Sequence, residues 1–158
     1  MNGIEPSPET FQSDSLIAGT QATLESMATS AHSQCLLCGQ ANPLGFHLTF
    51  RVQPDNSVAA TFLCREVFRS YSGILHGGVI SALLDAAMTN ALFSKGVAGV
   101  TAELTVRFLA PVALNRSAVV RASLEREAHP LYCLRAELAQ EGELMARAKA
   151  KFMAKRDL

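Results

Sequence analysis

The stretch YSGILHGGVISALLDAAMTNALF, residues 71–93, combines residue types that can do chemistry on a carbonyl group. It contains His76-Gly77-Gly78 at the start of a long apolar run, and its only charged side chain is Asp85. Glycines at a helix start let another group approach the backbone, where the first N–H groups lack internal partners and can hold an anion or a developing oxyanion. A carboxylate among apolar residues is a candidate base or nucleophile facing a cleft. Together these residues indicate a site.

Each residue of this stretch also has a purely structural interpretation. A helix that is apolar nearly all round is buried nearly all round, and an unpaired carboxylate there would cost several kcal/mol or take up a proton. Asp85 could therefore be paired, or reach water at a subunit seam. Gly77-Gly78 could serve only a tight turn into the helix, and His76 only a structural hydrogen bond.

The spacing of the two parts predicts a site shared between chains. Asp85 follows His76 by nine positions, which is about 180° around a helix and roughly 13 Å along it. These two residues of one chain therefore cannot easily meet on one small substrate. A second helix lying antiparallel beside the first would bring Gly77 of one chain near Asp85 of the other, so we expect a two-fold homodimer.

Alternating apolar and polar residues predict the strands that position this helix. GFHLTFRV at 45–52 and SVAATFLC at 57–64 are expected to form a hairpin, and TAELTVRF at 101–108 a further strand. In that further strand the inward residues are expected to be Ala102, Leu104, Val106 and Phe108. We expect five strands, in the order strand, strand, helix, strand, strand, strand. One-sided alternation indicates an antiparallel sheet with one wet face, so the helix at about 77–94 must cover the dry one. The predicted fold is α+β, a curved antiparallel sheet wrapped around a central helix.

Composition limits the remaining possibilities. With 158 residues, 49% of them hydrophobic, the chain can bury one core but not two. The net charge of zero argues against nucleic acid as a partner, and no uncharged apolar run is long enough for a membrane span. No Lys or Arg precedes Arg51, and neither a secretory nor a transit pattern is present, so a cytoplasmic protein with reduced cysteines is expected. Residues 1–34 are interpreted as an N-terminal extension, mobile or docked, before a domain at 35–158.

Three sequence stretches resemble one known family. GILHGGVISALLDAAM, TAELTVRFLAPV and the upstream CLLCGQANPLGFHLTF are similar to the hot-dog fold thioesterases over roughly residues 35–153. The last stretch resembles the Cys-x-x-Cys-Gly…Asn-Pro-x-Gly opening of many members of the phenylacetyl-CoA thioesterase-like (PaaI-like) branch. The resemblance implies an acyl-CoA thioesterase of open acyl specificity, a homodimer or dimer of dimers, without a cofactor.

The resemblance also implies roles for individual residues. The backbone N–H of Gly77 would polarise the thioester carbonyl, and Asp85 of the partner chain would attack that carbonyl or activate a water. Thr101 corresponds to a Ser or Thr that helps to position the water, and His76 lines the site. This chemistry needs an oxyanion donor and a base or nucleophile, and it requires no metal.

Three further residues are predicted to bind substrate. Ser70 stands six residues before the histidine, where some members have an assisting Asn with a longer side chain. Gly78 belongs to the helix start. Arg107 is one of a basic set that could meet the phosphates of coenzyme A, although a solvated sheet face is favoured for any single member of that set; the others are Arg116, Arg121, Lys149 and Lys151.

A second cluster offers metal-binding residue types. His32, Cys35, Cys38 and His47 could bind zinc, but a convincing zinc site needs a second pair to match the Cys-x-x-Cys, so a structural or idle thiol pair is favoured.

Two functions other than thioester hydrolysis are compatible with the same fold. A non-catalytic acyl-CoA-binding sensor would usually carry a basic DNA-binding module, which residues 1–34 lack. A hydratase or dehydratase of acyl thioesters would need a different His–carboxylate motif.

Overall fold

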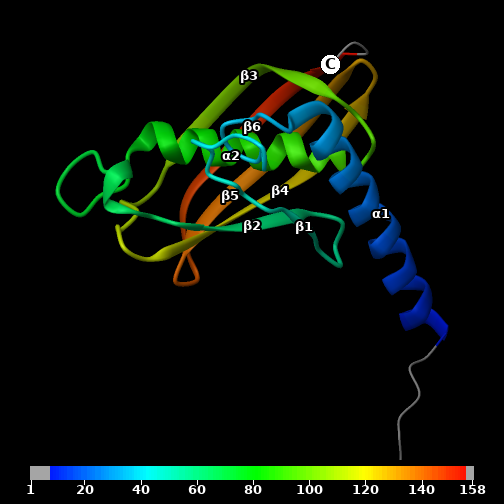
Figure 1. Cartoon of the computed structure of the whole chain (residues 1–158), viewed down its shortest axis with the longest axis horizontal. Helices are drawn as coiled ribbons and strands as arrows, with labels where there is room; N and C mark the ends of the chain where they lie inside the picture. Colours follow the sequence, from blue (N-terminus) through cyan, green and yellow to red (C-terminus); the bar gives the residue numbers. More distant parts are fainter. Residues whose placement is uncertain (1–7, 156–158) are drawn as a thin grey trace, which may run out of the picture.

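A six-stranded antiparallel sheet curves around one buried helix (Figure 1). The computed structural model describes residues 8–155. Their elements follow in the order α1 (Pro8–His32), β1 (Arg51–Val52), β2 (Val58–Leu63), a 3-10 turn (Glu66–Phe68), α2 (Gly77–Phe93), β3 (Gly99–Phe108), β4 (Ser117–Ala128), β5 (Leu131–Gln140) and β6 (Glu143–Ala154). Neighbouring strands pair in the order β1-β2-β4-β5-β6-β3. The predicted arrangement of sheet and central helix is therefore confirmed, but four strands rather than three follow the helix.

Helix α2 lies across the inner face of the sheet and forms the centre of the core (Figure 1). Its bounds match the predicted helix to within one residue. Leu83, Ala87 and Leu92 are fully or almost fully buried in one cluster with Leu134 and Phe152 of the sheet. An apolar surface on nearly every side of a helix requires cover on nearly every side, and here the sheet and α1 provide it. Neither described helix is long and apolar enough to cross a membrane.

The first predicted strand is much shorter than expected. Of residues 45–52 only Arg51–Val52 pair with β2. The N–H groups of Phe46 and Leu48 instead donate to carbonyls of the loop after α1, at 2.8 and 2.9 Å, and His47 has a positive φ of 51°. The alternation identified the buried side chains of this segment correctly, but their backbone follows that loop rather than a neighbouring strand.

Strand β3 is less buried than its pattern predicted. Leu104 and Val106 are half-buried, whereas Ala102 and Phe108 are exposed, Phe108 by 53%. The reason is its place at the end of the sheet, where it pairs only with β6 within the chain. An edge strand has a neighbour on one side only, so its inward residues receive less cover than those of β4 to β6.

Helix α1 occupies most of the predicted N-terminal extension, and its second half docks on its own chain. Leu24 enters the main core with 3% of its surface exposed. The Gln21 Oε1 accepts a hydrogen bond of 2.7 Å from the Val52 N–H, and Glu25 forms an ion pair with Arg51. The second half of the helix is thereby attached both to α2 and to the short strand β1.

Truncation of Leu24 tests this docking. Leu24→Ala is expected to lower the free energy of unfolding by about 2 kcal/mol or more, because it leaves a cavity in the core beneath α1. Leu16 of the same helix is 67% exposed, so Leu16→Ala should change stability by less than about 0.5 kcal/mol. Urea unfolding of the two variants measures both values, and equal small effects would mean that α1 does not pack in solution.

Candidate active site

The start of α2 is organised by the side chain of His76. This residue caps the helix with extended backbone angles (φ −65°, ψ 131°), and its Nδ1 accepts a hydrogen bond of 2.9 Å from the Gly78 N–H. The Gly78 N–H is therefore already used by the His76 side chain. Among residues 8–155 the Gly77 N–H donates no hydrogen bond, which leaves it available at the positive end of the helix dipole.

The space around Gly77 is limited on one side by an aromatic ring. A Cβ atom built on Gly77 would lie 3.4 Å from Cζ of Phe108, which is ordinary van der Waals contact. Phe108 is itself half exposed at the end of β3. The free N–H therefore lies beside an apolar wall at the surface of a single chain.

The carboxylate of Asp85 occupies the middle of the same helix and is half-buried. Its Oδ1 accepts a hydrogen bond of 2.7 Å from the Thr101 hydroxyl. Burial raises the pKa of Asp85 above its usual value, while the Thr101 hydrogen bond and the charge of His32 act in the opposite direction. A carboxylate with a raised pKa and one fixed hydroxyl partner has the properties of a general base or nucleophile.

A β-bulge at the start of β3 directs Thr101 to this carboxylate. In antiparallel strands, opposite residues lie on the same face of the sheet. Thr101 is opposite the buried Phe152, and Glu103 is opposite the exposed Lys151, with the register shift between them at Ala102. The bulge therefore turns Thr101 toward α2 while Glu103 points outward.

His32, at the end of α1, is a neighbour of Asp85 that the sequence did not assign to the site. Its ring packs edge-on against Phe93 of α2 with centroids 4.9 Å apart. Burial lowers the pKa of His32, and the charge of Asp85 opposes that effect. The sequence singled out His32 only as a possible zinc ligand together with Cys35, Cys38 and His47, and gave no sign that it would approach the carboxylate.

The helix start and the carboxylate remain apart within one chain. Gly77 and Asp85 are eight residues apart on a continuous helix, which separates them by about 12 Å. Ser70 lies exposed in the loop before α2, where its backbone N–H donates to Ile74. The structure thus brings together the predicted residues Asp85 and Thr101 near the middle of α2. Ser70 and Gly77 lie apart from them, at the N-terminal end of the helix.

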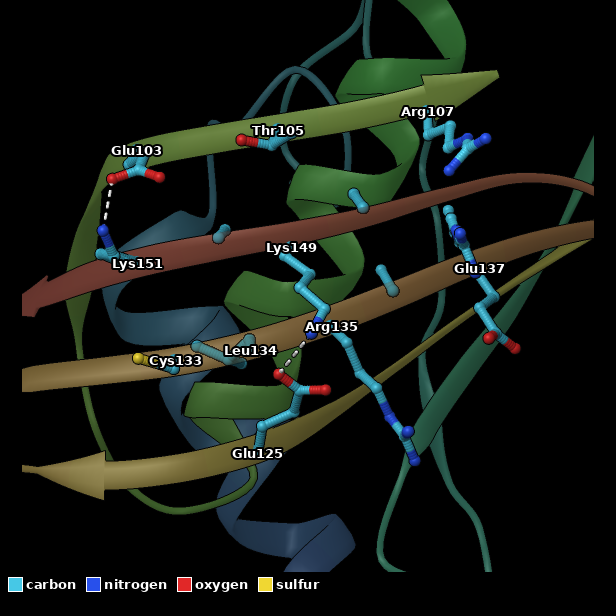
Figure 2. A pocket seen from close by; sticks show the side chains of 14 residues that line it. Glu103, Thr105, Arg107, Glu125, Cys133, Leu134, Arg135, Glu137, Lys149 and Lys151 are labelled. Carbon is cyan, nitrogen blue, oxygen red and sulfur yellow. Dashed lines mark hydrogen bonds and ion pairs between the residues drawn. The ribbon is translucent and has the colours of Figure 1, made fainter. Parts of the chain in front are cut away.

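Arg107 lies on the opposite face of the sheet from Asp85. It lines a hollow of about 750 Å³ on the outer face, which Figure 2 shows with α2 behind the sheet. The hollow has charged walls, with ion pairs from Lys151 to Glu103 at 2.6 Å and from Lys149 to Glu125 at 3.7 Å. Within one chain the sheet therefore separates Arg107 from the candidate catalytic pair.

The comparisons with known proteins agree with this fold. The family model of the thioesterase superfamily matches residues 72–146. A phenylacetic acid degradation-related protein from Ralstonia eutropha JMP134 is 27% identical, with a TM-score of 0.62 over 68% of this chain and 85% of that one. The PaaI protein of E. coli, from the phenylacetic acid degradation operon, is 17% identical, with a TM-score of 0.73 over 89% and 96% of the two chains. A hypothetical thioesterase protein from Streptococcus pneumoniae TIGR4, solved with coenzyme A, is 17% identical, with a TM-score of 0.64 over 68% and 88%. No match is found among curated protein sequences.

The sheet, the central helix and these matches define a thioester hydrolase with the hot-dog fold. Residues 72–146 match the model of the thioesterase superfamily, and PaaI proteins are among the structural relatives of the chain, as the sequence resemblance predicted.

The hydrogen bond between Thr101 and Asp85 gives a test of the carboxylate's environment. Thr101→Val keeps the side-chain shape and removes the hydroxyl donor, so it should raise the pKa of Asp85 further. If the ionised carboxylate is the active form, the acid limb of the profile of kcat/KM against pH moves to higher pH, which a series of assays across acidic to neutral pH measures. Thr105→Val, on the outer face of the same strand, is the matched control and should leave the acid limb in place. If the acid limb of Thr101→Val stays where it is in the wild type, ionisation of Asp85 does not control kcat/KM.

Proposed function

We propose that this protein hydrolyses an acyl- or aryl-acyl-CoA thioester to the free acid and coenzyme A. The observation that carries the proposal is the half-buried Asp85 carboxylate, held by Thr101 at 2.7 Å on a helix that is otherwise largely apolar. Asp85 attacks the thioester carbonyl or takes a proton from a water that attacks it. The Gly77 N–H of the partner chain stabilises the oxyanion that forms on the carbonyl oxygen. The sulfur of coenzyme A then leaves as the thiol with the proton taken from the attacking water. Where Asp85 itself attacks, the product is an anhydride between the acyl group and Asp85, which a water then hydrolyses to the free acid while supplying the thiol proton.

The division of the site between two chains is supported by the surface that one chain leaves uncovered. A stripe of small residues along α2, next to Asp85, is left uncovered: Gly78 is exposed, and Ser81 and Ala82 are only half-buried. Small side chains let a second copy of α2 approach closely. Strand β3 has a free edge, and Val100 and Phe108 on it are 45% and 53% exposed. A partner that covered these residues would remove apolar surface from water.

The assembly gives a direct prediction. We expect a homodimer, or a dimer of dimers, at micromolar concentration, because the catalytic pair and the oxyanion donor of one site come from different chains. Static light scattering on the purified protein, with activity measured on the same fractions, checks this. A stable monomer with full activity would show that the site is complete within one chain.

The proposed substrate class is supported by the match to the thioesterase superfamily model and by two structures of similar fold. One of these was solved with acetyl-CoA and the other with coenzyme A. A panel of short-chain, long-chain and aryl-acyl-CoA thioesters, with the released thiol detected colorimetrically, tests the proposal and ranks the acyl groups. Release of thiol that depends on Asp85 supports hydrolysis. Tight binding of acyl-CoA without release of thiol from any member of the panel would instead identify a binding protein.

A further inference from the structure

Three side chains with metal-binding atoms converge where α1 ends. His32 is the last residue of α1, and Cys35 and Cys38 lie in the loop that follows. One ligand atom of each lies within 4.8 Å of the others, and Nδ1 of His32 is 3.7 Å from Sγ of Cys38. His47, the fourth residue of the pattern in the sequence, is not part of this group.

The spacing of these atoms suits a tetrahedral zinc ion. With Zn–S bonds of about 2.3 Å and Zn–N bonds of about 2.0–2.1 Å, neighbouring ligand atoms lie roughly 3.5–3.8 Å apart. The His32–Cys38 distance already falls in this range. The remaining pairs lie within 4.8 Å, so they would have to close by at most about 1 Å to reach this range.

The loop is folded tightly around the Cys35 sulfur. The Leu37 N–H donates to the sulfur at 3.4 Å, an arrangement that stabilises a thiolate. The Gly39 N–H donates to the Cys35 carbonyl at 2.9 Å. A Cβ atom on Gly39 would lie 2.6 Å from that carbonyl oxygen, so only glycine closes the loop in this way. The backbone is thus already shaped to present Cys35.

Helix α2 covers the cluster on the inner side. Cys38 is 7% exposed, and Asn90 of α2, whose amide donates to the Ala86 carbonyl at 2.8 Å, is 1% exposed. The ring of Phe93 packs against the ring of His32. The three ligands therefore come from the end of α1 and its loop, while α2 supplies the wall behind them.

We propose that His32, Cys35 and Cys38 bind one Zn²⁺ ion that fastens the end of α1 and its loop against α2. Nδ1 of His32 and the two sulfurs supply three ligands, and a water molecule supplies the fourth. Two thiol protons are released on binding, and the two thiolates then balance the charge of the ion. The sequence favoured idle thiols because a second Cys/His pair was missing. The structure instead brings a histidine to the two cysteines, and two cysteines, one histidine and a water form a ligand set known from catalytic zinc sites.

Metal content tests the proposal independently of catalysis. The full-length protein, purified with reductant and without added metal, should contain close to one zinc per chain by elemental analysis. After removal of zinc by a strong chelator, the melting temperature should fall, and added Zn²⁺ should restore it. Added Co²⁺ should give the visible absorption of tetrahedral cobalt together with a thiolate charge-transfer band.

The substitutions Cys35→Ser and His32→Gln each remove one ligand and should weaken zinc binding by more than about 100-fold, the upper range for loss of an outer-shell partner. Cys133→Ser removes a thiol on the outer face of the sheet and should bind zinc as the wild type does. Circular dichroism confirms that each variant is folded before titration.

Either of two results would overturn the site. One is metal-free protein that takes up neither Zn²⁺ nor Co²⁺ under reducing conditions. The other is zinc binding that is equally strong in Cys35→Ser, His32→Gln and Cys133→Ser. Because these measurements do not use turnover, the proposed hydrolase activity and the zinc site can fail separately.

Discussion

Asp85→Asn is expected to lower kcat by about 10²–10⁴-fold, the usual contribution of a positioned acid–base group. The amide has the shape of the carboxylate and can still accept the hydrogen bond from Thr101, but it can neither take up a proton nor attack a carbonyl. Coenzyme A binding should change little, because in the proposed mechanism the side chain acts on the carbonyl and not on coenzyme A. Turnover and melting temperature, measured on the same preparation, separate this result from a folding defect.

The stability of Asp85→Asn follows from the direction of the pKa shift. Burial raises the pKa of Asp85 in the folded protein, so the folded state holds this proton more tightly than the unfolded chain. The associated stability is present below the pKa of the unfolded chain and is lost as the pH rises through the raised folded value. The variant avoids this loss, so its melting temperature at neutral pH should equal or exceed that of the wild type. The difference should vanish in acid, where Asp85 is protonated in both states.

The opposite pattern would contradict a catalytic role. If Asp85 is only a structural partner of Thr101, the variant should melt at a lower temperature while its turnover per folded molecule stays near normal. That result would remove Asp85 from the mechanism.

Gly77→Pro is expected to lower kcat by about 10²–10³-fold, the loss typical of one oxyanion donor. Proline deletes the backbone N–H that the proposed mechanism uses, and it does so at the first position of a helix, where proline is well tolerated. The extended backbone of His76 (ψ 131°) already suits a residue that precedes proline. The melting temperature should therefore change little.

Gly77→Ala is the matched control, because it keeps the N–H and adds only a methyl group. That methyl meets the Phe108 ring at 3.4 Å, so folding and most of the activity should survive. Equal turnover of the Ala and Pro variants, measured with the best acyl-CoA of the panel, would show that the Gly77 N–H does not contact the oxyanion.

Mixing the two inactive variants tests whether the site is shared. If Gly77 of one chain serves Asp85 of the other, a heterodimer of Gly77→Pro and Asp85→Asn contains one intact site and one doubly altered site. Random exchange of subunits in an equal mixture should then restore about a quarter of the wild-type activity. A site contained in one chain would give no recovery, although each variant alone would still be inactive.

The placement of Thr101 shows where reasoning from periodicity fails. Strict alternation, with Ala102 inward, puts Thr101 on the same face as Glu103 and away from the helix. The family resemblance implied the opposite, and the bulge between these residues explains the observed contact with Asp85. A bulge adds one residue to one strand, and its position depends on the pairing with β6, which the sequence of β3 alone does not encode.

The sequence by itself determined the elements whose signals are local. The uninterrupted apolar run of α2, with His76 and two glycines at its start, fixed that helix to within one residue, because capping and burial act over a few neighbouring residues. Alternation likewise predicted that the sheet is antiparallel and which face of most of its strands is buried. The same local signals singled out Asp85 as the charge that needs an explanation.

Only the tertiary structure decided which distant residues surround that charge. His32 approaches Asp85 because α1 docks on α2 through Leu24, a contact between helices that are far apart in sequence and carry no mutual pattern. Arg107 was a reasonable phosphate contact in the sequence, but the sheet separates it from Asp85. Which residues become neighbours depends on how complete elements pack, and that packing is set by the whole core rather than by any one segment.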